Sequence, residues 1–83
     1  MSTEKSIHVR YFAVLREKRG ISQETVSTTA ETAGDLYQEL KTKFHFLLES
    51  SHVKVALNDE FRDPKTLLKS GDTVVFIPPV AGG

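Results

Sequence analysis

The chain has 83 residues, and eleven basic side chains balance eleven acidic ones, so its formal net charge at neutral pH is zero. This length supports one domain with a small core and no large enclosed substrate cavity, and the balanced charge argues against a nucleic-acid or anionic-membrane partner held by bulk electrostatics. Cysteine is absent, which excludes disulfides, thiolate metal sites and a cysteine nucleophile.

The N-terminal residues and the distribution of apolar residues predict a cytoplasmic protein. Residues 1–6, MSTEKS, contain no apolar segment of the kind found in signal peptides. No run approaches the roughly 18 apolar residues that a membrane-spanning helix requires.

The first part of the chain predicts a β-hairpin. Residues 7–12, IHVRYF, alternate between two faces and are rich in β-branched and aromatic side chains, as in a strand. Residues 13–20, AVLREKRG, predict a helical turn or loop that Gly20 closes with a positive φ. Residues 21–28, ISQETVST, predict a second strand that pairs with the first.

Residues 31–44, ETAGDLYQELKTKF, carry the clearest helical pattern in the chain. Thr32 suits the N-cap, and Asp35 lies three residues later, near the positive end of the helix dipole. Apolar residues then recur about every four positions. The stripe expected to be buried consists of Leu36, Leu40 and Phe44, flanked by Tyr37 and Leu47.

The second half of the chain predicts three more strands. Residues 53–63, VKVALNDEFRD, read as a strand, a tight turn and a short return strand. Leu67 and Leu68 are expected in the core, and the turn at 70–72 leads into residues 73–77, TVVFI, a strand buried on both faces. The whole chain, residues 1–83, is thus predicted to be one α+β domain, a single sheet of about five strands with one main helix on one face.

The body of the domain shows no pattern typical of catalysis. The three histidines, His8, His45 and His52, do not have the spacing of metal ligands, so no metal site is predicted. The acidic residues between 59 and 63 are explained by a charged turn, and no phosphate-binding loop or bound cofactor is predicted.

The last six residues, 78–83, predict a flexible functional tail. Pro78 and Pro79 cannot donate a ladder hydrogen bond, so the preceding strand must end there. They also bias the backbone towards an extended geometry that projects the following residues away from the body. Val80 would supply one apolar anchor.

Ala81, Gly82 and Gly83 have almost no side-chain bulk, so this backbone is expected to enter a channel too narrow for larger residues. The Gly83 carboxylate is ionised at neutral pH and is a poor electrophile, so chemistry there needs activation, most simply as an acyl-adenylate made by another enzyme. The alternative is a frayed terminus without a role.

Four segments together resemble one known family: FAVLREKRG, TAGDLYQELKTKF, VKVALND and LKSGDTVVFIPPVAGG. The chain resembles the small, sulfur-carrying subunit of molybdopterin synthase, a ThiS/MoaD-like member of the ubiquitin-like β-grasp superfamily. The resemblance spans nearly the whole chain. Its specific part is FIPPVAGG, together with the Gly-Asp turn before the last strand. It implies a β-grasp fold with a mixed sheet.

The resemblance also implies a function. Gly83 would be adenylated by a ubiquitin-activating-like adenylyltransferase that uses ATP, while the carrier itself binds no cofactor. A sulfur donor enzyme would then convert the carboxylate to a thiocarboxylate. The tail would enter the active site of the molybdopterin synthase large subunit and give sulfur to cyclic pyranopterin monophosphate. The family implies a heterotetramer, two carriers on a dimer of large subunits, in which the carrier is not catalytic alone.

In such proteins, apolar residues on the exposed sheet face near the tail dock the partners. Phe61 and Ile77 are the candidates here, whereas Phe76 is expected in the core; the alternative is that all three are core residues. Arg16 lies in a segment that matches the family's LRE motif and is a candidate contact with the large subunit.

Three other functions stay open at this point. A thiamine-pathway sulfur carrier also ends in Gly-Gly, although such carriers usually lack the Pro-Pro before the tail and are shorter after the first strand. A ubiquitin-like modifier would be joined to target lysines through Gly83, starting from the same adenylate. A plain interaction domain would have an inert terminus.

Overall fold

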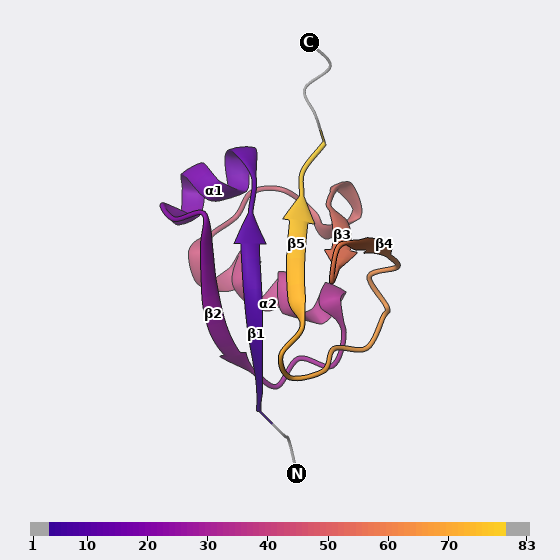
Figure 1. The fold of residues 1–83 in the computed structure, drawn as a ribbon. Coiled ribbons are helices and arrows are strands. Elements are labelled where there is room, and N and C mark those ends of the chain that lie inside the picture. Colours follow the sequence, from indigo (N-terminus) through magenta and orange to yellow (C-terminus); the bar gives the residue numbers. More distant parts are fainter. Residues whose placement is uncertain (1–3, 80–83) are drawn as a thin grey trace.

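One mixed sheet of five strands, in the order β2-β1-β5-β3-β4, organises the computed structural model, which describes residues 4–79 (Figure 1). Helix α2 lies across one face of this sheet. The pair β1–β5 is parallel, and the other neighbours are antiparallel. The predicted α+β architecture is therefore confirmed. The elements are β1 (Lys5–Tyr11), α1 (Ala13–Arg19), β2 (Gln23–Thr28), α2 (Ala33–Phe44), the 3₁₀ helix η1 (Ser50–His52), β3 (Lys54–Leu57), β4 (Glu60–Arg62) and β5 (Thr73–Ile77).

The first two strands form the predicted hairpin, and helix α1 lies in the connection between them. The ladder runs from Lys5 opposite Thr28 to Arg10 opposite Gln23. Gly20 closes α1 with a φ of 86°, a left-handed conformation that glycine adopts without strain. The predicted helical turn and its Gly20 cap are confirmed.

Strand β5 lies at the centre of the sheet, between β1 and β3. Its middle residues, Val74, Val75 and Phe76, are all buried, as the nearly continuous apolar sequence predicts. Beyond β3, the chain returns as β4 through a two-residue turn at Asn58 and Asp59, both of which have positive φ. This conformation is typical of tight hairpin turns and is tolerated by Asn and Asp.

Helix α2 begins as the sequence predicts, with the Thr32 side chain accepting a hydrogen bond of 3.1 Å from the Asp35 amide. The Gly34 amide in the first turn donates to the Pro64 carbonyl at 2.8 Å. A Cβ atom at Gly34 would lie 3.3 Å from Pro64, so glycine permits this close approach. The buried residues of the helix are Ala33, Leu36, Tyr37 and Leu40.

Two leucines expected near the core are instead exposed. His45 ends α2 in a left-handed conformation, which turns the chain so that Phe46 enters the core and Leu47 points outwards, 89% exposed. Leu68 is buried as predicted, whereas Leu67, the preceding residue, is 65% exposed. Adjacent residues of an extended segment point to opposite sides, so one of this pair must face away from the core.

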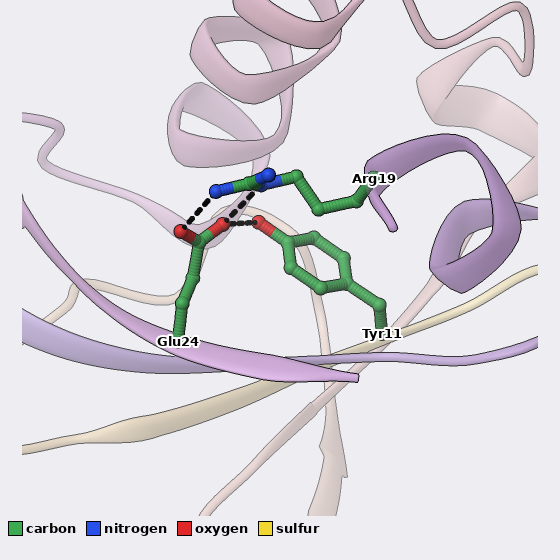
Figure 2. Close-up of polar contacts among 3 residues, drawn as sticks. All are labelled: Tyr11, Arg19 and Glu24. Carbon is green, nitrogen blue, oxygen red and sulfur yellow. Dashed lines mark hydrogen bonds and ion pairs between the residues drawn. The ribbon is translucent and has the colours of Figure 1, made fainter. Parts of the chain in front are cut away.

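A partly buried polar cluster of three residues holds α1 against the hairpin (Figure 2). Both Glu24 carboxylate oxygens accept from the Arg19 guanidinium, at 2.8 Å each. The Tyr11 hydroxyl donates to the same carboxylate at 2.6 Å. The Arg19 guanidinium also lies 4.1 Å from the centroid of the Phe44 ring, so this one side chain connects α1, β2 and the end of α2.

The cluster favours the charged carboxylate and the neutral phenol. Hydrogen bonds from Arg19 hold the pKa of Glu24 below its ordinary value, against the opposing effect of partial burial. Burial, reinforced by the hydrogen bond to Glu24, raises the pKa of Tyr11 above its ordinary range. Both pKa shifts agree with the geometry, since the bidentate Arg19 guanidinium stabilises the Glu24 carboxylate, which accepts a hydrogen bond from the neutral Tyr11 hydroxyl.

We predict that Glu24→Gln lowers the free energy of unfolding by about 1–3 kcal/mol at pH 7, because one neutral amide cannot satisfy both the guanidinium and the phenol. Chemical denaturation monitored by circular dichroism measures this difference. Glu60→Gln is the matched control, since the Glu60–Arg62 pair is exposed and such pairs contribute little.

The difference in unfolding free energy between wild type and Glu24→Gln should depend on pH. Since the folded-state pKa of Glu24 lies below its ordinary value of 4.5, its stabilisation is fully present above that value. It is lost as the pH falls through the folded-state pKa. The stability gap between wild type and Glu24→Gln should therefore narrow in acid; a gap that stays constant down to complete protonation would contradict this role.

Candidate functional site

The base of the tail lies at the end of the central strand. β5 ends at Ile77, so the prolines terminate the strand as predicted. Pro78 is buried and Pro79 is exposed, and the chain leaves the body there. The predicted tail residues Val80, Ala81, Gly82 and Gly83 lie outside the described residues. Covalent geometry alone keeps Gly83 within about 14 Å of Pro79.

The sheet face opposite α2 carries an apolar row that crosses three strands. Val75 in β5 pairs with Ala56 in β3, and Ala56 pairs with Phe61 in β4. Paired residues of neighbouring strands share a face. Val75 and Ala56 are buried but do not belong to the core cluster under α2, which supports this assignment. We call this side of the sheet the open face.

Both apolar docking candidates lie on the open face. Phe61 is 71% exposed, and Ile77 is partly buried two residues beyond Val75. Residues i and i+2 of a strand share a face, so Ile77 belongs to the same surface as Phe61. Phe76 is fully buried on the other side, and its predicted place in the core is confirmed. A role in docking stays a prediction for Phe61 and Ile77.

Basic side chains surround this apolar centre. Lys54 pairs with Ile77, and Arg10 pairs with Val75, so both cations lie on the open face. The Arg10 guanidinium lies 5.9 Å from the ring centroid of Phe12, a half-exposed aromatic residue at the start of α1. An apolar centre with a basic rim suits a protein partner whose own apolar patch is bordered by carboxylates.

Arg16 lies on α1 and not on the sheet. Its side chain is exposed and, among residues 4–79, forms no ion pair. The Tyr11–Arg19–Glu24 cluster fixes the helix that carries it. Helix α1 lies at the same end of the sheet as the end of β5 (Figure 1). The structure therefore leaves Arg16, which α1 carries, accessible there, and its contact with a partner stays a prediction.

The segment after α2 presents a surface that the sequence analysis did not identify. The Tyr37 hydroxyl donates to the Leu48 carbonyl at 2.7 Å, and burial raises the pKa of this phenol to about 12. Phe46 is buried against Tyr37 and Tyr11, while Leu47 between these anchors is exposed. No sequence signal indicated that Leu47 is exposed, because it continues the apolar spacing of α2 beyond the end of the helix.

Neither a metal-binding cluster nor a membrane-spanning helix occurs in the described part of the chain. Residues 4–79 contain no group of three or more His, Cys, Asp or Glu side chains that could hold a metal ion. Over the same residues, no helix is long and apolar enough to cross a membrane.

The sequence matches the ThiS family over residues 9–83. A molybdopterin synthase sulfur carrier subunit from Drosophila sechellia is 33% identical over 82 residues, which cover 94% of this chain and 91% of the relative. The Haemophilus influenzae protein of the same name is 31% identical over 80 residues, covering 93% of this chain and 99% of its own length.

Solved structures show the same architecture. The HVO 2177 protein of Haloferax volcanii superimposes with a TM-score of 0.79 at 30% identity, over 96% of this chain and 88% of its own. Small archaeal modifier protein 1 from Haloferax volcanii superimposes with a TM-score of 0.74 at 26% identity, over 94% of this chain and 99% of its own. A chain from the complex of subunits 1 and 2 of molybdopterin-converting factor from Helicobacter pylori superimposes with a TM-score of 0.63 at 30% identity, over 94% of this chain and 99% of its own.

Similarity to a distant protein extends the fold assignment. A ubiquitin from Caldiarchaeum subterraneum is only 14% identical but superimposes with a TM-score of 0.64 over 98% of this chain and 100% of its own. The mixed sheet, the crossing helix and this likeness show a ubiquitin-like β-grasp fold. Since the family match covers nearly the whole sequence, the chain belongs to the ThiS family.

Proposed function

We propose that this chain is the sulfur carrier subunit of molybdopterin synthase. The observation that carries the proposal is the similarity of the chain to relatives of nearly the same length that bear this name. The family match, which runs through β5 and the tail to Gly83, supports a carrier role. The chain is then not an enzyme by itself, but a cytoplasmic subunit that delivers sulfur to a partner's active site.

The chemistry takes place at the Gly83 carboxylate. A carboxylate oxygen attacks the α-phosphorus of ATP in a ubiquitin-activating-like adenylyltransferase, and pyrophosphate leaves. The resulting acyl-adenylate is a good electrophile. A sulfide or persulfide sulfur from a donor enzyme then attacks the carbonyl carbon and AMP leaves; where a persulfide is the donor, a reductant cleaves its S–S bond. The product is a thiocarboxylate, with sulfur in place of one carboxylate oxygen.

The tail then carries this group into the large subunit. Pro78 and Pro79 set the direction in which it leaves the sheet, Val80 is its apolar anchor, and Ala81 and Gly82 let the backbone fit a narrow channel. There the sulfur passes to cyclic pyranopterin monophosphate. The open face, with Phe61 on the edge strand β4 and Ile77 on the central strand β5, docks the large subunit, and Arg16 adds a contact from α1. Two carriers on a dimer of large subunits complete the assembly.

We predict that the intact chain gains the mass of one sulfur minus one oxygen when incubated with its adenylyltransferase, ATP and a sulfide source. Intact-mass spectrometry measures this gain. A chain that lacks Gly83 is the control and should gain nothing. Adding the large subunit and the pterin precursor should then reverse the gain, which separates this pathway from the thiamine pathway.

Adenylation without any gain of sulfur would contradict the proposal and favour a protein modifier. That second candidate is supported by the likeness to small archaeal modifier protein 1, at 26% identity. Lysine-linked conjugates of the chain, detected by blotting and lost when Gly83 is removed, would establish it. If no reaction occurs while the enzyme is shown to be competent in a control, the tail is inert and the proposal is wrong.

We predict that Phe61→Ser weakens binding to the large subunit at least tenfold, because a large aromatic side chain that an interface buries contributes about 2 kcal/mol. Isothermal titration calorimetry measures the affinity. Leu67→Ser is the matched control, since Leu67 is similarly exposed but lies in the connection from β4 to β5, bridged to Thr32 at the start of α2 and away from the open face. Equal affinities for the wild type and Phe61→Ser would remove Phe61 from the docking surface.

A further inference from the structure

An apolar groove outside the open face lies between α1 and the segment that follows α2. It has a volume of about 310 Å³. Its two exposed apolar side chains are Val14, 55% exposed, and Leu47, 89% exposed. The residues that line the groove are Val14, Leu15, Lys18, Phe46, Leu47 and Leu48. We call it the α1 groove.

Both walls of the α1 groove are held in place by buried contacts. On one side, Leu15 is buried, and the Arg19–Glu24 ion pair ties α1 to β2. On the other side, Phe46 is buried and the Leu48 carbonyl accepts from the Tyr37 hydroxyl. The exposure of Leu47 is therefore imposed by its neighbours, and the groove needs little ordering before a partner binds.

The α1 groove lies at the end of the molecule from which the tail emerges. Figure 1 shows α1, the segment between α2 and η1, and the end of β5 at the same end of the sheet. The β1–β5 register pairs Tyr11 with Phe76, which brings the start of α1 beside the start of the tail. Gly83 reaches at most about 14 Å from Pro79. An enzyme that receives Gly83 must therefore contact this end of the molecule.

The charge at the rim of the groove indicates the chemistry of its partner. Lys18 is the charged residue in the lining of the groove. Within residues 4–79 it forms no ion pair, whereas Arg19 on the same helix is paired with Glu24. The complementary surface is an apolar projection with a carboxylate beside it.

We propose that the α1 groove is a second docking surface for the large subunit, separate from the open face. This inference rests on the proposed function. Two enzymes would receive the tail, but the large subunit is the one that forms a lasting assembly with the chain. A stable interface buries about 800 Å² on each partner, and the few apolar residues of the open face are a small part of such an area. The α1 groove supplies further apolar area beside the tail.

The test measures the affinity of the full-length chain for the large subunit by isothermal titration calorimetry. Leu47→Ser and Val14→Ser should each weaken binding about tenfold, as expected for the loss of a buried aliphatic contact. Leu67→Ser, which changes a similarly exposed leucine elsewhere, should leave the affinity unchanged. All variants should keep the wild-type melting temperature. Lys18→Glu should weaken binding, most strongly at low salt, because it places a charge of the wrong sign opposite the partner's carboxylate.

The outcomes separate this inference from the proposed function. Unchanged affinity in Leu47→Ser and Val14→Ser, with weaker binding in Phe61→Ser, overturns the second surface and leaves the carrier function intact. Slower adenylation in Leu47→Ser, with unchanged binding to the large subunit, also overturns it, by assigning the groove to the activating enzyme. If the wild type does not bind the large subunit, the inference fails; the carrier function fails only if Gly83 also acquires no sulfur.

Discussion

The position of β5 at the centre of the sheet is the constraint on which the rest of the structure depends. Its apolar residues are buried from both sides, with Val74 and Phe76 under α2 and Val75 on the open face. Pairing with β1 on one side and β3 on the other fixes its direction and register. The strand ends at Ile77, so the tail starts from a fixed point at the end of the central strand.

A rigid base matters because a short peptide that enters a channel loses conformational freedom. Ordering the backbone costs about 1–2 kcal/mol per residue, and a tail of small residues has few side-chain contacts to offset this. If the tail enters a partner's channel as proposed, the body of the domain must therefore supply most of the binding free energy. The surfaces proposed for this role are the open face, which carries Phe61, and the α1 groove, which carries Leu47.

The polar cluster of Tyr11, Arg19 and Glu24 links the core to this arrangement. Without a partner, the partly buried Glu24 carboxylate would destabilise the hairpin; without Glu24, Arg19 would lose its bidentate contact. The cluster also sets the place of α1, which carries Val14 and Arg16. A contact that stabilises the fold thus also positions residues beside the base of the tail. A substitution in the cluster should therefore change the position of α1 as well as the stability of the domain.

The sequence by itself determined most of the elements, because these depend on local patterns, whereas the chemistry expected of the tail stays a prediction. Alternation marked β1, four-residue spacing and the Thr32 cap marked α2, and the prolines marked the end of β5. Only the tertiary structure decided which apolar residues remain exposed. Leu47 follows the helical spacing, yet the left-handed turn at His45 directs it outwards. The pairing of Arg19 with Glu24 likewise depends on how α1 folds back on the hairpin, which no local pattern encodes.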